Sequence, residues 1–86
     1  MTEKKFNIGL AREITEGNKF GRIKTRDGKP ARIICWNAKG NYPIVALVDM
    51  GSFETPISYT TDGKDDWRKN VRSNFDIVIE VEGGEV

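Results

Sequence analysis

The sequence contains no histidine and a single cysteine, Cys35, among its 86 residues. A Ser-His-Asp triad, a Cys-His pair and a Cys/His zinc site all need residues that are missing, so the sequence predicts a non-enzymatic protein without metal or cofactor. One cysteine cannot form an internal disulfide, and no charged-then-apolar leader opens the chain, so we expect a cytoplasmic location. No apolar run approaches the about 20 residues of a transmembrane helix, and no membrane partner is expected.

Two places in the sequence have residues that could act as a nucleophile or bind a metal ion, and we interpret both as structural. Cys35 lies in a run of apolar residues, and without a histidine to take its proton it is expected to be a core residue rather than a nucleophile. Asp62, Asp65 and Asp66 form the only carboxylate cluster, and carboxylates can hold Mg²⁺ or Ca²⁺. The rest of a calcium loop is missing, so a solvated turn is expected there.

The length and composition predict one small domain over residues 1–86, ordered from about residue 6 to residue 82. Charged residues make up 31% and apolar residues 37% of the chain, which is typical of a globular rather than a disordered protein. Residues 1–5 are polar and are expected to fray. Asn7 suits the N-cap of a helix over residues 8–16, and a strand over residues 6–10 is the alternative.

The stretch of residues 21–48 organises the chain, because it contains the first strong strand signals. An Asp-Gly step at Asp27 and Gly28 separates two runs rich in β-branched residues, which favours a tight hairpin. A third run, residues 44–48, is apolar at both parities of the strand alternation. We therefore predict a three-stranded antiparallel meander whose third strand is central and covered on both faces.

The second half predicts two further strands around a second Asp-Gly turn at Asp62 and Gly63. Residues 55–60 contain Pro56 in second position, and because proline cannot donate to a ladder this strand is expected to begin at an edge or a bulge. The last strand runs from Phe75. One parity is expected to face inward, namely Phe75, Ile77, Ile79 and Val81. The other parity is expected to face solvent apart from Val78, namely Asp76, Glu80 and Glu82.

Together these elements predict a mainly β fold, a five-stranded antiparallel bent sheet or a small, partly open barrel with one short N-terminal helix. The competing architecture is an antiparallel sheet with one face covered by the helix. The residues on the apolar parity of each strand form the expected core: Ile33, Ile44, Ala46, Val48, Ile57, Ile77 and Ile79.

Three blocks of sequence carry a resemblance to a known family. They are residues 25–35 (TRDGKPARIIC), residues 42–48 (YPIVALV) and residues 59–64 (YTTDGK), followed by Phe75-Asp76-Ile77. In their order and spacing they resemble a family of small uncharacterised proteins found in phages, prophages and gut bacteria. The resemblance implies a phage-linked setting and assigns no catalytic or binding residue. The chain departs from the pattern at residues 16–21 and 65–73.

The charge is unevenly distributed along the chain. Residues 1–41 hold ten Lys/Arg and four Asp/Glu, a balance of +6, whereas residues 42–86 hold four and nine, a balance of −5. The densest basic cluster comprises Lys19, Arg22, Lys24, Arg26, Lys29 and Arg32. Such a cluster is expected either to pair with the acidic half or to contact phosphates, with Trp36 or Tyr42 stacking on bases. An exposed Trp36 beside these groups favours nucleic-acid binding, and a buried one disfavours it.

Two aromatic side chains fall on expected loops rather than on inward strand positions. Phe53 lies beside Gly51 and Ser52, and Trp67 lies in an irregular charged segment. Such aromatics either tuck against the fold or anchor an interface. We interpret the chain as a phage-linked protein-interaction module acting on a host or phage protein, with a small-barrel nucleic-acid-binding protein as the alternative.

Overall fold

The computed structural model describes residues 2–66 and 73–81, which form one short helix and six strands. In chain order the elements are β1 (Thr2–Lys5), α1 (Ile8–Thr15), β2 (Gly21–Thr25), β3 (Ala31–Cys35), β4 (Ile44–Asp49), β5 (Glu54–Tyr59) and β6 (Ile77–Val81). The strands build two three-stranded antiparallel sheets, in the orders β1-β6-β2 and β3-β4-β5. The predicted mainly β class with a short N-terminal helix is confirmed for these residues.

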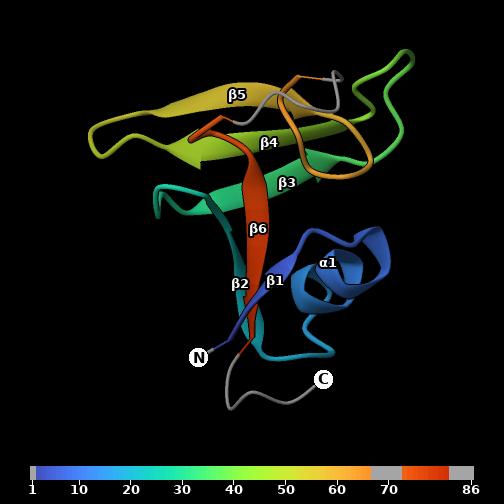
Figure 1. Cartoon of the computed structure of the whole chain (residues 1–86), viewed down its shortest axis with the longest axis vertical. Coiled ribbons are helices and arrows are strands. Elements are labelled where there is room, and N and C mark those ends of the chain that lie inside the picture. Colours follow the sequence, from blue (N-terminus) through green and yellow to red (C-terminus); the bar gives the residue numbers. More distant parts are fainter. Residues whose placement is uncertain (1, 67–72, 82–86) are drawn as a thin grey trace.

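The two sheets lie across one another. Figure 1 shows the sheet β3-β4-β5 passing over one end of the sheet β1-β6-β2, with α1 beside the latter. The described strands do not close into a barrel, and the single five-stranded sheet expected from the sequence is wrong. The chain instead divides its strands between two sheets that share one core.

The chain changes sheets between β2 and β3, where the sequence predicted a hairpin. The Asp-Gly turn itself forms: Gly28 has φ of +96° and donates its N–H across the turn at 2.9 Å. Among the described residues, β2 and β3 then pair only at an isolated bridge between Lys24 and Pro30. Pro30 has no N–H to extend this pairing, and its carbonyl oxygen accepts the N–H of Asp49 at the end of β4 (2.9 Å). The meander expected over residues 21–48 is therefore wrong, and β3, β4 and β5 form the meander instead.

Residues 2–5, which belong to the segment that was expected to fray, are part of a sheet. Thr2–Lys5 pairs antiparallel with β6, with Thr2 opposite Val81 and Lys5 opposite Val78. The strand carries no apolar side chain, so no hydrophobic alternation marks it in the sequence, and main-chain pairing with β6 holds it in place. As a result β6 is the central strand of its sheet, between β1 and β2.

The helix α1 forms where the capping residue predicted it, and the alternative of a strand over residues 6–10 is wrong. The side-chain oxygen of Asn7 accepts a main-chain N–H of the first turn at 3.0 Å. Ala11 is fully buried, and Ile14 packs so closely on Gly21 that a Cβ there would lie 2.9 Å from Ile14 Cδ1. The helix therefore packs against the start of β2.

The core contains most of the residues that the strand parities predicted. Six of the seven expected residues are buried, namely Ile33, Ile44, Ala46, Val48, Ile77 and Ile79. Ile57 is half-buried, because β5 is an edge strand. Five further residues belong to the same apolar cluster: Phe6, Ala11, Ile23, Tyr59 and Val81. The core therefore draws on both sheets and on the helix.

The sheet β3-β4-β5 matches the predicted positions of its strands but not the predicted covering of its faces. β4 is the central strand, and β5, which contains Pro56, lies at the edge, as expected. On the inner face of β4 the side chains are buried, whereas Val45 and Leu47 on the outer face are only half-buried. The expectation that both faces of this strand are covered is therefore confirmed for the inner face and met only in part on the outer face.

The two Asp-Gly turns hold the start of β6 from both sides. Arg26 in the first turn donates its N–H to the carbonyl oxygen of Asp76 (2.7 Å), and Ile77 donates its N–H to the carbonyl oxygen of Gly63 in the second (2.8 Å). Gly63 has φ of +81°, and a Cβ on it would lie 2.5 Å from Phe6 Cβ and 2.9 Å from the Ile77 carbonyl oxygen. The second turn therefore joins the sheets at a place with no room for a side chain.

Replacing each turn glycine with alanine separates backbone strain from steric overlap. Gly28 also has a positive φ, but nothing lies within 4 Å of a Cβ there, so Gly28→Ala is expected to cost about 1 to 2 kcal/mol of unfolding free energy through backbone strain alone. Gly63→Ala adds the overlap with Phe6 and Ile77 and should cost about 1 to 3 kcal/mol more. Urea unfolding of both variants measures the difference, and equal costs would contradict the packing described at Gly63.

Candidate functional site

The six residues of the predicted basic cluster are all paired with carboxylates. The pairs are Lys19 with Glu13 (4.0 Å), Arg22 with Glu80 (3.3 Å), Lys24 with Glu80 (3.4 Å) and Glu3 (3.7 Å), Arg26 with Asp76 (3.6 Å), Lys29 with Asp27 (2.5 Å), and Arg32 with Glu54 (2.9 Å). The exposed pairs add little stability, but in every pair the carboxylate lowers the local positive potential. Only three members of the cluster lie on strands, Arg22 and Lys24 on β2 of one sheet and Arg32 on β3 of the other.

Trp36 is not presented beside the basic residues. It is half-buried against the core, and the guanidinium carbon of Arg12 on α1 lies 5.0 Å from the centre of its ring. This cation–π contact occupies a face on which a base would otherwise stack. Tyr42, the other residue expected to stack, is half-buried as well. The geometry therefore weakens the nucleic-acid hypothesis.

Asp76 was expected to face solvent, and this expectation is wrong. Its side chain is buried, and its two carboxylate oxygens accept the N–H groups of Asp65 (3.0 Å) and Ser73 (3.2 Å). Arg26 supplies the nearby positive charge, and the Ser73 hydroxyl donates to the carboxylate of Asp65 at 2.9 Å. Asp76 precedes the first residue of β6, so the alternation of that strand does not determine its direction. No hydrophobic pattern identifies this role from the sequence.

Tyr59 lies next to this carboxylate and is fully buried. Its hydroxyl donates to the carbonyl oxygen of Phe75 at 2.6 Å. Burial, followed by the negative charges of Asp65, Asp76 and Asp27, holds the pKa of Tyr59 well above its ordinary value. The phenol is therefore a neutral structural donor that fixes the start of β6.

The first Asp-Gly turn is built around Asp27. The hydroxyl of the buried Thr25 donates to one oxygen of the Asp27 carboxylate and accepts the N–H of Lys29 at 2.9 Å. The hydrogen bonds from Lys29 and then from Thr25 lower the pKa of Asp27 below its ordinary value. Lys29 also lies 5.6 Å above the ring of Phe75, so the turn contacts the same region as Tyr59.

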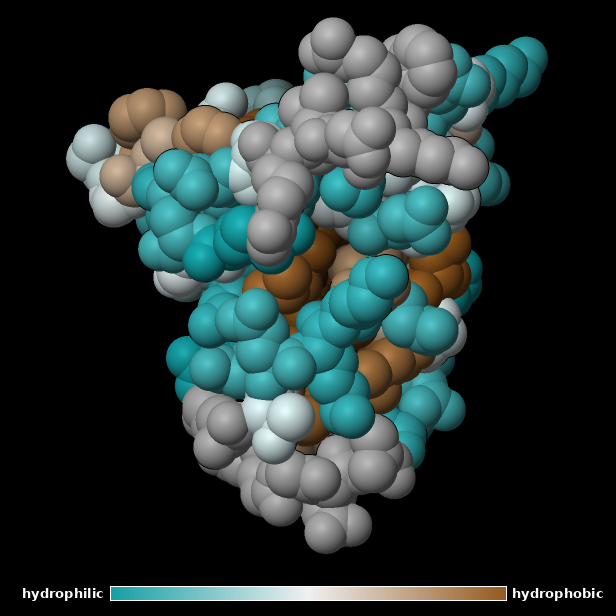
Figure 2. Space-filling model, viewed as in Figure 1, coloured by the Kyte–Doolittle hydropathy of each residue, from teal (hydrophilic) through white to brown (hydrophobic). Residues whose placement is uncertain are grey.

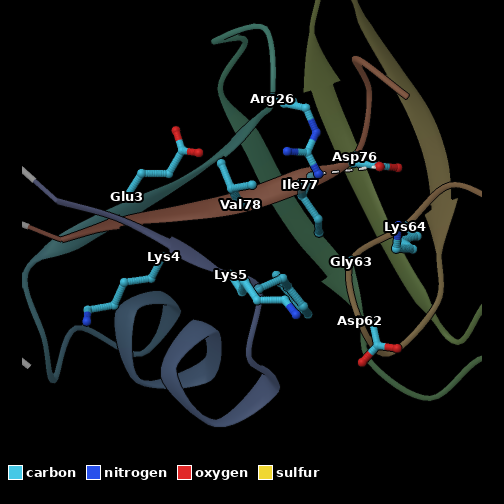
Figure 3. Close-up of a pocket in the computed structure, with 11 residues that line it drawn as sticks. Glu3, Lys4, Lys5, Arg26, Asp62, Gly63, Lys64, Asp76, Ile77 and Val78 are labelled. Carbon is cyan, nitrogen blue, oxygen red and sulfur yellow. Dashed lines mark ion pairs between the residues drawn. The ribbon is translucent and has the colours of Figure 1, made fainter. Parts of the chain in front are cut away.

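A groove of about 550 Å³ opens between β1 and the second Asp-Gly turn. Its lining residues are Glu3, Lys4, Lys5, Phe6, Arg26, Asp62, Gly63, Lys64, Asp76, Ile77 and Val78. In Figure 3, Lys5 extends from β1 toward the turn that contains Asp62, while Glu3 points to the other side of the strand. Lys4 and Lys5 belong to the segment expected to fray, so the sequence analysis missed this groove.

Among the residues that the structure describes, three large apolar side chains are exposed: Phe20 by 86%, Phe53 by 60% and Ile34 by 51%. Phe53 lies in the turn between β4 and β5, where its carbonyl oxygen accepts the N–H of Met50 at 2.8 Å. Figure 2 shows brown, apolar atoms at this tip of the molecule. Phe53 is therefore presented rather than tucked against the fold, whereas Trp67 lies outside the described residues.

The residues considered for chemistry are engaged in local contacts. Cys35 is half-buried, with its sulfur 3.7 Å from the side-chain oxygen of Asn37. Within residues 2–66 and 73–81 no three His, Cys, Asp or Glu side chains come together as a possible metal site. No helix in the described part of the chain is long and apolar enough to cross a membrane. No protein-family model matches the chain, and no curated protein or solved structure matches it.

The contribution of the buried Asp76 carboxylate to stability can be tested by replacing Asp76 with asparagine, which has the same shape. Asp76→Asn keeps the shape but places an amide nitrogen where one main-chain N–H needs an acceptor, so we expect a loss of about 1 to 3 kcal/mol in unfolding free energy. The control Asp62→Asn changes an exposed carboxylate in a turn that accepts either residue and should stay within about 0.5 kcal/mol of the parent. Chemical denaturation reports both values, and equal effects would show that Asp76 does not hold the junction.

The lowered pKa of Asp27 predicts a pH-dependent contribution to stability. The ionised carboxylate is favoured in the folded state, so its contribution is present above the pKa of an unfolded aspartate, about 4, and is lost as the pH falls through the lower folded value. We expect the melting temperatures of the parent and Asp27→Asn to differ at pH 6, about two units above that value, and the difference to shrink steadily as the pH falls below about 4. Thermal melts across this range measure the difference. A constant difference would contradict the assigned shift.

Proposed function

We propose that the chain is a protein-interaction module in which Phe53, at the turn between β4 and β5, is an anchoring side chain. The observation that carries the proposal is the 60% exposure of this phenylalanine at the end of a hairpin. Aromatic residues contribute a disproportionate share of binding energy when a partner removes them from water. Met50 beside it is half-buried and extends the apolar surface of the tip.

The surroundings of Phe53 indicate the character of the partner surface. Asp49 and Glu54 lie on either side of the tip, and Asp49 accepts the N–H of Gly51 at 2.8 Å while Glu54 pairs with Arg32. An apolar side chain between two carboxylates fits an apolar pocket with a basic rim. The family resemblance in the sequence supports a host or phage protein as the owner of that pocket.

Nucleic-acid binding is the weaker proposal because its expected residues are engaged elsewhere. Each cation of the basic cluster has a carboxylate partner, and Arg12 occupies a face of Trp36. Fewer unpaired cations mean fewer phosphates neutralised and a weaker electrostatic attraction. Nuclease treatment distinguishes the two proposals directly.

Capture of partner proteins from a bacterial lysate tests whether Phe53 is an anchoring residue, with Phe20 as the control aromatic. Immobilised Phe53→Ala is expected to lose a partner that the parent retains, while its stability stays within about 1 kcal/mol of the parent. Phe20→Ala, which removes an even more exposed phenylalanine outside the tip, should retain that partner. Trp67→Ala belongs in the same set, because the sequence predicts the same role for it.

Mass spectrometry of the captured material, with and without nuclease, measures the outcome. A partner held equally by the parent and Phe53→Ala would refute the anchoring role. A partner released by nuclease would support nucleic-acid binding instead.

A further inference from the structure

The groove beside β1 has the size of a binding site and a partly apolar lining. Its volume of about 550 Å³ falls within the roughly 300 to 1,000 Å³ typical of ligand sites. Phe6, Ile77 and Val78 supply apolar lining, and Figure 2 shows brown atoms at the base of a hollow between the two sheets. Charged side chains surround this apolar floor. The groove can therefore take a ligand that has both apolar and charged groups.

The internal ion pairs leave positive charge on one rim. Arg26 offsets Asp76 at 3.6 Å, and Glu3 is paired at 3.7 Å with Lys24, which does not line the groove. Asp62 and Lys64 add one charge of each sign to the opposite rim.

Lys4 and Lys5 are the other two charged residues of the groove lining. Neither has an ion pair within the described part of the chain, in contrast to all six members of the basic cluster. The uncompensated cations of this surface are thus on β1.

We propose that this groove binds an extended acidic peptide segment of a partner protein. Successive strand residues such as Lys4 and Lys5 point to opposite faces, so carboxylates on one face of the segment would pair with Lys5, which extends toward the second Asp-Gly turn (Figure 3). β1 is an edge strand with four residues, so an extended segment can lie along it. The site does not include Phe53, which is not among its lining residues, so this inference stands apart from the proposed function.

The structure favours an acidic peptide over two other occupants. Lysines on an edge strand oppose pairing with the same edge of a second copy of the chain. A nucleic-acid strand needs aromatic faces for its bases, and the one aromatic residue of the lining, Phe6, is only 8% exposed. Glu3 and Asp62 on the rims would also repel a continuous phosphate backbone. A peptide can instead present an amide or a cation to them.

A fluorescein-labelled peptide of alternating Glu and Val residues is the direct probe. We expect its anisotropy to rise when it is titrated with the purified full chain at about 50 mM salt, and the affinity to fall as salt is added. Lys4→Glu with Lys5→Glu should weaken binding about tenfold or more. The matched control is Lys19→Glu with Lys39→Glu, which makes the same change in net charge on two lysines outside the lining and should alter the affinity by less than about threefold.

Further measurements keep the test decisive. Thermal melts establish that both double variants are folded. If charge reversal on β1 prevents folding, Lys4→Gln with Lys5→Gln replaces it, and a loss of affinity is again expected. Amide chemical shifts should change along β1 and around Gly63 when the peptide is added.

Four outcomes would overturn the proposal. They are no binding of the Glu-Val peptide, equal weakening by the control variant, equal affinity for an alternating Lys-Val peptide, and shift changes confined to other parts of the chain. Oligothymidylate binding at β1 in place of the peptide would assign the groove to nucleic acid.

Discussion

The rest of the structure depends on how the start of β6 is held. Main-chain hydrogen bonds from the two Asp-Gly turns reach Asp76 and Ile77 from opposite sides, and the carboxylate of Asp76 accepts two more N–H groups. A chain of 86 residues has a modest core, so two small sheets need such a junction to keep one orientation. Gly63 adds a close contact with Phe6 that leaves no space for a side chain. Hydrogen bonding and packing thus meet at a single point between the sheets.

The same junction determines which charges remain available at the surface. By placing β2 beside β6, the fold brings Arg22 and Lys24 to Glu80, and it brings Arg26 to Asp76. The charge separation along the sequence is therefore largely cancelled in space. Within residues 2–66 and 73–81, Lys4 and Lys5 on β1 have no ion pair, and the hairpin tip between β4 and β5 carries the exposed Phe53. Both features suit association with other proteins, through two separate surfaces.

Structure that depends on neighbouring residues can be predicted from this sequence. Asn7 predicts its helix because the cap bonds to the first turn, and the Asp-Gly steps predict their turns because glycine accepts a positive φ. Strand parity predicts the inner-face positions of β4 and, in β6, Ile77, Ile79 and Val81, whereas the buried Val78 lies on the other parity. β1 has no apolar residue to mark it as a strand in the sequence. Asp76 lies just before β6, so the alternation of that strand gives the wrong direction for its side chain.

The sequence by itself thus determined the helix, the turns, most strands and most of the core, since these follow from capping, backbone sterics and hydrophobic period over a few residues. Only the tertiary structure decided which strands pair, which carboxylates neutralise the basic cluster, and where the groove opens. β2 and its partner β6 are more than fifty residues apart, as in the pair Ile23 and Ile79. Pairing over such a separation depends on the fit of whole elements, and on the entropy of closing the chain between them, rather than on any local pattern.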